Sequence, residues 1–330
     1  AGPAHLAPAV SEDSAPAPAR TRRRGLLVTA RTTLAVLVVL GVSIALAQNW
    51  SAVATHVTQV SARTWALAIL AGFASPLLTV LGWRALLADL GSPLHLAPAS
   101  GIFLVGQLGK YLPGSVWSVL AQAEMASRLD IPRRRTSVAA LVAMALALIT
   151  GVLVGLPAVP LLLRRGEHGS VIIAGVAAVM LLLALWPPLL NRAIARGLRL
   201  LRREPLERAF SGRALLAAGA WTLLAWLATG AIAWAFAADL APEGTPAADL
   251  AMLCLSGFAL AAAVGMASVL LPAGVGVREG VLLLLLLTAI TAPAATAVVI
   301  LTRFVTVVAD VAWAGLGWAW ARAHHLLPGT

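Results

Sequence analysis

The sequence has 330 residues, of which 60% are hydrophobic and only 11% are charged, and its mean hydropathy is +0.92. Soluble domains carry about 25% charged residues, so this composition excludes a soluble globular protein and indicates an integral membrane protein. The net charge of +11 would suggest nucleic-acid binding in a soluble chain. Here the arginines gather between apolar segments, as they do in cytoplasmic loops, and we expect no nucleic-acid partner.

The N-terminal residues 1–19 show no apolar periodicity, and a run of arginines follows them. We therefore predict a disordered, basic-ended cytoplasmic tail over 1–25, a transmembrane domain over 26–322 and a short C-terminal tail over 323–330. The first apolar segment ends in small residues that resemble a signal-peptide cleavage site. Because the polar tail before it is long for a signal peptide, we expect an uncleaved membrane anchor.

Six apolar segments reach the roughly 17–25 residues that a helix needs to cross a bilayer. They are 26–47, 65–87, 137–163, 169–187, 213–237 and 294–320. Between the fourth and fifth, arginines recur at helical spacing beside a leucine stripe, which predicts a basic amphipathic helix on the inner membrane surface. A cytoplasmic N-terminus places most of the 24 Lys and Arg residues on the cytoplasmic side. The sequence therefore predicts an all-α polytopic protein of the plasma membrane with both termini in the cytoplasm.

Two further apolar regions, 99–128 and 250–291, are each interrupted near the middle by Leu-Pro and glycine. Proline lacks a backbone N–H and ends a helix, so each region is predicted to be a broken or re-entrant helical hairpin. In the predicted topology the first hairpin enters from the cytoplasm and the second from outside, and each opens on Ser-Gly. Opposed broken helices are typical of inverted-repeat transporters, whose substrate sites lie at the breaks. The alternative is a chance recurrence of these dipeptides in a low-diversity sequence.

The single lysine of the chain, Lys110, and its single tyrosine, Tyr111, are neighbours just before the first break. Pro113 and Gly114 would end one half-helix and Ser115 could cap the next, leaving free backbone N–H groups beside an ammonium group. This combination is typical of a phosphate-binding site. The alternative is that Lys110 extends to the inner interface and that Pro-Gly forms an ordinary turn.

The second break contains two glycines, Gly274 and Gly276, shortly before Arg278. The glycines permit close backbone approach, and an arginine at a helix start offers two-point contact to a phosphate. Their spacing does not match a P-loop or a dinucleotide-binding loop, which argues against an NTPase. The alternative role of Arg278 is mutual charge neutralisation with Glu279 at the membrane boundary.

Three other charged residues, Glu124, Arg303 and Asp310, lie in or near apolar segments. The last two are seven residues apart and therefore on the same face of one helix. Charged groups inside a membrane are functional candidates, because leaving them unpaired is costly. The alternative for Arg303 and Asp310 is structural, with both tying the last helix to the Arg278–Glu279 pair.

The motifs Gly-Lys-Tyr-Leu-Pro-Gly-Ser-Val-Trp at 109–117 and Pro-Ala-Gly-Val-Gly-Val-Arg-Glu-Gly at 272–280, with Arg303 in the last span, resemble the lysylphosphatidylglycerol synthase transmembrane region family. The resemblance covers about residues 26–322, and Ala273 departs from the glycine that relatives often have. It implies a flippase-like membrane domain. Larger relatives flip aminoacylated phosphatidylglycerol made by a soluble synthetase domain, which we do not expect in this sequence. Stand-alone relatives are associated with translocation of lipids or polyprenyl-linked sugars.

We therefore expect a lipid flippase that moves an aminoacyl-phospholipid or a polyprenyl-phosphate-linked sugar across the plasma membrane. The candidate headgroup-binding residues are Lys110, Tyr111, Pro113, Gly114, Ser115, Gly274, Gly276 and Arg278, and the candidate charge-balancing or coupling residues are Glu124, Glu279, Arg303 and Asp310. Expected partners are membrane lipids and a separately encoded lipid synthetase or glycosyltransferase. No cofactor, metal or catalytic residue is expected. Two alternatives stay open: a non-catalytic partner of a lipid-linked glycosyltransferase, and a lipid-modifying enzyme, for which neither motif offers a histidine.

Overall fold

The computed structural model describes residues 58–111, 116–159, 185–268 and 274–324, together with the single positions 175, 179 and 183. Every regular element within these residues is a helix, which confirms the predicted all-α class. The predicted tail 1–25, the first span 26–47 and most of the span 169–187 lie outside the described residues, as does the C-terminal tail beyond residue 324.

Five helices in the described part of the chain are long and apolar enough to cross a membrane. They are α3 (Ala62–Asp89), α6 (Arg133–Gly155, continued by the 3-10 turn η2, Leu156–Ala158), α10 (Gly212–Leu240), α11 (Ala247–Ala267) and α13 (Ala292–Ala323). Four of them match predicted spans. The fifth, α11, belongs to the region 250–291, for which two half-helices were predicted. Because no proline interrupts residues 247–267, α11 reaches full spanning length before the break.

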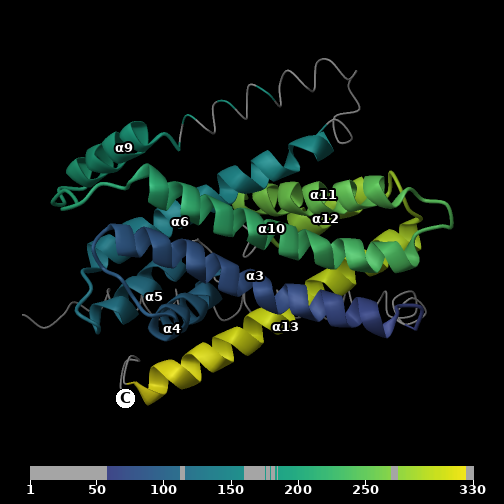
Figure 1. Cartoon of the computed structure of the whole chain (residues 1–330), viewed down its shortest axis with the longest axis horizontal. Coiled ribbons are helices and arrows are strands. Elements are labelled where there is room, and N and C mark those ends of the chain that lie inside the picture. Colours follow the sequence, from purple (N-terminus) through teal and green to yellow (C-terminus); the bar gives the residue numbers. More distant parts are fainter. Residues whose placement is uncertain are drawn as a thin grey trace, which may run out of the picture.

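Shorter helices complete the described structure. They are α4 (Leu96–Gln107), the 3-10 turn η1 (Leu108–Tyr111), α5 (Val116–Ser127), α9 (Pro187–Leu200) and α12 (Val277–Leu286). The helix α9 corresponds to the predicted basic amphipathic helix. It lies at one end of the bundle (Figure 1).

Side-chain caps join both ends of the antiparallel pair α3 and α10. The backbone N–H of Ser61, the N-cap of α3, donates to Asp239 near the end of α10 at 2.8 Å. At the opposite end, Asp89 accepts from the backbone N–H and the hydroxyl of Ser211, the N-cap of α10, at 2.7 and 2.9 Å. Each cap also satisfies an otherwise free helix N–H. The two helices therefore lie side by side along the length of the bundle (Figure 1).

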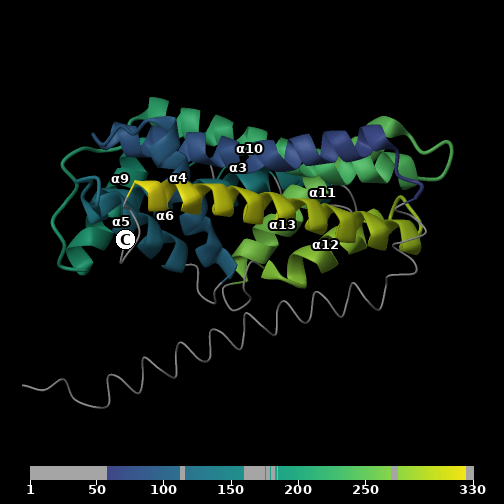
Figure 2. The same ribbon diagram turned by 90° about the horizontal axis from the view of Figure 1, so that it is seen from below.

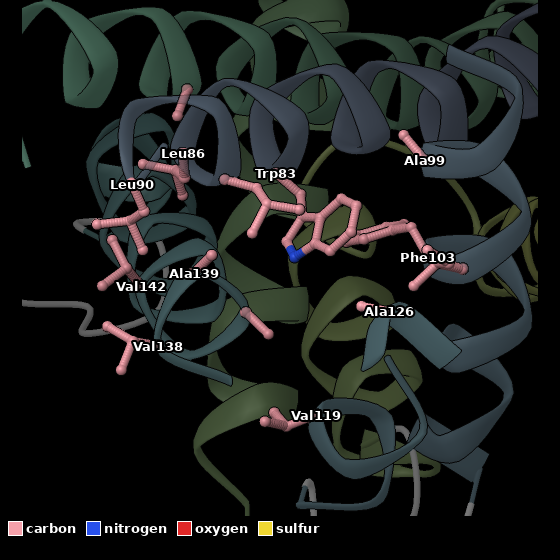
Figure 3. Close-up of a cluster of buried hydrophobic side chains, with 14 of the residues drawn as sticks. Trp83, Leu86, Leu90, Ala99, Phe103, Val119, Ala126, Val138, Ala139 and Val142 are labelled. Atoms are coloured by element: carbon pink, nitrogen blue, oxygen red, sulfur yellow. The ribbon is translucent and has the colours of Figure 1, made fainter. Parts of the chain in front are cut away.

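The buried apolar side chains form two main cores, one in each half of the bundle. The first joins the C-terminal half of α3, including Trp83, to α4, α5, α6 and the start of α10 (Figure 3). The second joins the other half of α10, including Phe236, to α11, α12 and the start of α13. On α10 the first core ends at Ala218 and the second begins at Ile232. The middle of α10 between these cores carries the polar residues Thr222 and Thr229.

The two interrupted regions form hairpins in opposite halves of the bundle (Figures 1 and 2). The hairpin of α4 and α5 begins and ends at one end, where Arg135 of α6 donates to Ser92, in the loop before α4, at 3.0 Å. The hairpin of α11 and α12 begins and ends at the other, where Leu250 and Ile290 share the second core. This is the opposed arrangement that the sequence predicts. The breaks themselves, at 112–115 and 269–273, lie outside the described residues.

The surface combines apolar sides with one basic end. Large apolar residues such as Leu70, Leu216 and Leu284 are 60% exposed or more, which suits contact with lipid chains and not with water. The end that carries the loop before α4 is strongly basic: it holds the N-termini of α6 and α10, the C-terminus of α13 and the helix α9, with Arg133, Arg134, Arg135, Arg192, Arg196, Arg213 and Arg322.

Candidate functional site

A cavity of about 340 Å³ lies between the two apolar cores. Both interrupted regions reach it, since its walls include Lys110 from the first and Gly274 and Arg278 from the second. The long helix α13 contributes Arg303 and Asp310. The polar side chains of its wall include Ser75, Thr79, Gln107, Ser118, Gln122, Thr229 and Thr306. Its apolar side chains include Trp83, Phe103, Met144, Trp226, Phe258 and Met266. Such a cavity is large enough for a small polar headgroup.

Lys110, Tyr111 and Asp310 form a cluster where the first interrupted region meets α13. The Lys110 ammonium lies 2.6 Å from the Asp310 carboxylate, and the Tyr111 hydroxyl donates to the same carboxylate at 2.7 Å. Glycine at position 109 makes this position possible, because a Cβ there would collide with the backbone of α5 at Ser118. The turn η1 can therefore lie directly against α5 and present Lys110 to the cavity.

The glycines of the second break have backbone conformations that other residues rarely adopt. Gly274 has φ +64° and Gly276 has φ +85°. A Cβ on Gly274 would stand 2.7 Å from the Cα of Gly265 in α11. The N–H of Gly276 donates to the Glu279 carboxylate at 2.7 Å, which caps α12. Close approach at Gly274 is therefore made to α11, a neighbour that the sequence did not identify.

A single carboxylate serves two arginines beside the second break. Glu279 lies 3.2 Å from Arg278 and 3.6 Å from Arg303. Arg278 also lies 5.6 Å from the centre of the Phe258 ring, within range of a cation–π contact. All three charged side chains are less than one quarter exposed. The pairing of Arg278 with Glu279 is present, but Glu279 cannot fully neutralise two guanidinium groups.

The helix α13 connects the two interrupted regions. Arg303 faces the second through Glu279, and Asp310, two turns later, faces the first through Lys110. In the described cluster three basic side chains thus face two carboxylates, which leaves one positive charge in excess.

The structure brings together most of the predicted residues that it describes and leaves one outside. Eight of the predicted residues lie at or beside the cavity, namely Lys110, Tyr111, Gly274, Gly276, Arg278, Glu279, Arg303 and Asp310. Glu124 does not line it: its side chain is 51% exposed and pairs with Arg133 at 2.9 Å, at the basic end. Pro113, Gly114 and Ser115 lie outside the described residues.

Sequence reasoning missed several polar residues of the cavity wall. Ser118 and Gln122 are four residues apart on α5, and Ser75 and Thr79 are four apart on α3. Polar residues that recur at this spacing in an apolar helix mark one polar face, and this pattern could have identified them. No group of three or more His, Cys, Asp or Glu suited to a metal ion occurs in the described part of the chain.

The family model of the lysylphosphatidylglycerol synthase TM region matches residues 28–314, which include both interrupted regions and Arg303 and Asp310 of α13. The chain belongs to this family. No match was found among curated proteins. Together with the five long apolar helices, membership of the family makes this a multi-pass membrane protein.

Proposed function

We propose that the protein is a flippase that moves a phosphate-bearing lipid across the plasma membrane, with the headgroup in the central cavity and the lipid chains in the bilayer. The observation that carries the proposal is the excess positive charge of a cavity at the middle of the bundle. An uncompensated charge in the middle of a membrane-spanning bundle is costly, so it is expected where an anionic ligand compensates it. The phosphate of an aminoacyl-phospholipid or of a polyprenyl-linked sugar supplies such an anion.

In this proposal Lys110, Arg278 and Arg303 bind the phosphate, while Asp310 and Glu279 compete with it for the same donors. That competition keeps binding weak enough for release, as transport requires. The same carboxylates are available to the ammonium group of an aminoacyl headgroup. A separately encoded lipid synthetase or glycosyltransferase would supply the lipid.

The route across the membrane follows from the opposed hairpins. We place the basic end in the cytoplasm, because basic residues favour that side, so that the hairpin of α4 and α5 begins on the cytoplasmic side and the hairpin of α11 and α12 on the outer side. Their broken ends then meet at the central cavity, one from each side, as in transporters with inverted repeats. Movement of one hairpin relative to α13 would open the cavity to one side at a time.

The decisive experiment compares two substitutions of Lys110 in purified protein reconstituted into liposomes. Lys110→Ala is expected to lower the flipping rate of a phosphatidylglycerol with a fluorescent acyl chain at least about tenfold, because it removes a charge-assisted contact to phosphate. Lys110→Arg should retain part of the rate, because it keeps the charge. The rate is measured as exposure of the fluorophore to a membrane-impermeant quencher.

Arg133→Ala is the matched control, because it removes a cation that pairs with Glu124 outside the cavity, and it should flip lipid at the wild-type rate. A wild-type rate in Lys110→Ala would show that the headgroup site lies elsewhere. If wild-type protein alone flips neither this lipid nor a polyprenyl-phosphate sugar, the flippase proposal fails. An accessory role beside a glycosyltransferase, or a lipid-modifying activity, would then be preferred.

A further inference from the structure

The helix α9 is held against the bundle in one rotational position. The side chain of Asn191 exchanges two hydrogen bonds with the backbone of Phe210, just before α10: its amide nitrogen donates to the Phe210 carbonyl and its oxygen accepts from the Phe210 N–H, each at 2.9 Å. Leu190, Ile194 and Leu198 pack against the first core. The apolar stripe of α9 therefore faces the protein, and these contacts also fix which side chains point away from it.

A second set of large apolar residues, on α9 and at its N-cap, points away from the bundle. Trp186, Leu189 and Leu200 are 60%, 46% and 85% exposed. Leu189, Ala193 and Leu200 share one helix face, because they are four and eleven residues apart. An open groove of about 450 Å³ is lined by Leu183, Trp186, Pro188, Leu189 and Arg192. Apolar surface of this kind is stable against an apolar partner and not in water.

Five arginines on α9 and in the loop after it form no ion pair with a carboxylate in the described part of the chain. They are Arg192, Arg196, Arg199, Arg202 and Arg203, all exposed. The first three form a row along one helix face, next to Leu189. Carboxylates of the same loop are already paired with α6. Glu204 pairs with Arg134 at 3.0 Å. Glu207 pairs with Arg134 at 3.1 Å and with Arg135. The five arginines therefore keep their charge for a partner outside the chain.

An anionic phospholipid complements both features. Its phosphate accepts two-point contacts from a guanidinium group, and its acyl chains cover the exposed apolar side chains. A nucleic acid also supplies phosphates, but it would leave Leu189 and Leu200 in water. We infer that the outward side of α9 is a binding surface for anionic phospholipids of the membrane leaflet at the basic end, where the helix lies (Figure 1). No residue of α9 lines the central cavity, so this surface is separate from the proposed headgroup site and does not rest on the flippase proposal.

The test measures which lipids lie next to α9. Ala193→Cys in a Cys254→Ala background carries a fluorophore on the exposed face, and the full chain is reconstituted into phosphatidylcholine nanodiscs with a small, fixed fraction of one lipid brominated on its acyl chains. Bromine quenches the fluorophore only at short range. Brominated phosphatidylglycerol should associate at least about fivefold more strongly than brominated phosphatidylcholine, the gain expected from one arginine near an anionic headgroup. Arg192→Gln combined with Arg196→Gln should lower this ratio to about twofold or less.

Arg133→Gln is the matched control, because it removes an arginine of the same basic end that already pairs with Glu124; it should keep the wild-type ratio. Leu189→Gln should weaken quenching by both lipids, because it removes apolar contact and no charge. Equal quenching by the two brominated lipids, or an unchanged ratio in the double arginine variant, would overturn the inference and leave these arginines a role in orientation alone. Quenching by neither lipid would also overturn it, since the outward side of α9 would then lie away from the membrane.

Discussion

The two glycines that follow the second break differ in why a larger residue would be unfavourable there. Gly274 and Gly276 both have positive φ, but only Gly274 also lacks room for a Cβ, because the backbone of Gly265 stands behind it. A Cβ on Gly276 meets nothing within 4 Å. One position therefore tests backbone strain alone, and the other tests strain together with helix packing.

We expect Gly276→Ala to lower the free energy of unfolding by about 1 kcal/mol, the usual cost of an L-residue at positive φ. Gly274→Ala should cost at least about 1 kcal/mol more, since overpacking adds to strain. Thermal or denaturant unfolding in detergent measures both. Equal losses would mean that α11 yields at Gly265 and that the close contact is not important for stability.

At the scale of elements, the hairpins and α13 together form the site. The hairpin of α4 and α5 presents Lys110 and Tyr111, and the start of α12 presents Arg278 and Glu279. The helix α13 supplies Asp310, the carboxylate that pairs with Lys110 of the first region. The second region pairs Arg278 with its own Glu279, and α13 adds Arg303 to that pair. Changes on α13 should therefore affect both packing and ligand binding.

Substitution of Asp310 by asparagine separates these two effects. The variant loses the ion pair with Lys110, so its free energy of unfolding should fall by about 1–3 kcal/mol. Its affinity for phosphatidylglycerol should rise, because Lys110 is no longer held by a competing carboxylate. Unfolding and lipid-binding measurements on one preparation of the variant and of the wild type give both changes. Weaker lipid binding would show that Asp310 positions Lys110 and does not compete with the phosphate.

At the scale of the whole molecule, two apolar cores enclose a polar middle, and the charges at the two ends differ. The end that holds α9 carries clusters of arginine, while the opposite end carries Arg63, Asp239, Glu243 and Asp249. A bundle with this asymmetry should insert with the arginine-rich end in the cytoplasm. In this orientation the hairpin of α4 and α5 begins on the cytoplasmic side and the hairpin of α11 and α12 on the outer side.

Cysteine labelling in intact cells tests this orientation. The native Cys254 is fully buried, and Cys254→Ala removes it at little cost in volume. In that background Glu243→Cys should react with a membrane-impermeant maleimide from outside, while Arg203→Cys, in the loop after α9, should react only after the membrane is permeabilised. Both positions are exposed. The reverse pattern would invert the topology and exchange the sides from which the two hairpins enter.

Patterns along the chain were sufficient for the class of protein, for most of the described spans and for the two interrupted regions. The length of an apolar segment reflects the thickness of the bilayer, and the effect of proline and glycine on a helix depends only on a few neighbouring residues. The same local reasoning identified Lys110, Arg278 and Arg303 as candidates, because a charge in an apolar segment is conspicuous wherever it stands. It treated α11 as a half-helix, since the position of a break indicates little about the length of the helix before it.

Which polar and charged side chains pair with one another was decided only by the tertiary structure. Asp310 is 199 residues from Tyr111 in the chain and yet accepts a hydrogen bond from its hydroxyl. Glu279 forms ion pairs with two arginines. Glu124 pairs with Arg133 outside the cavity. The buried atoms of Trp83 and Gln122 that lack hydrogen-bond partners in the described part of the chain likewise cannot be recognised from the sequence. Whether a polar atom is satisfied depends on which helices pack against it, and that depends on the shapes of many side chains acting together and not on any local pattern.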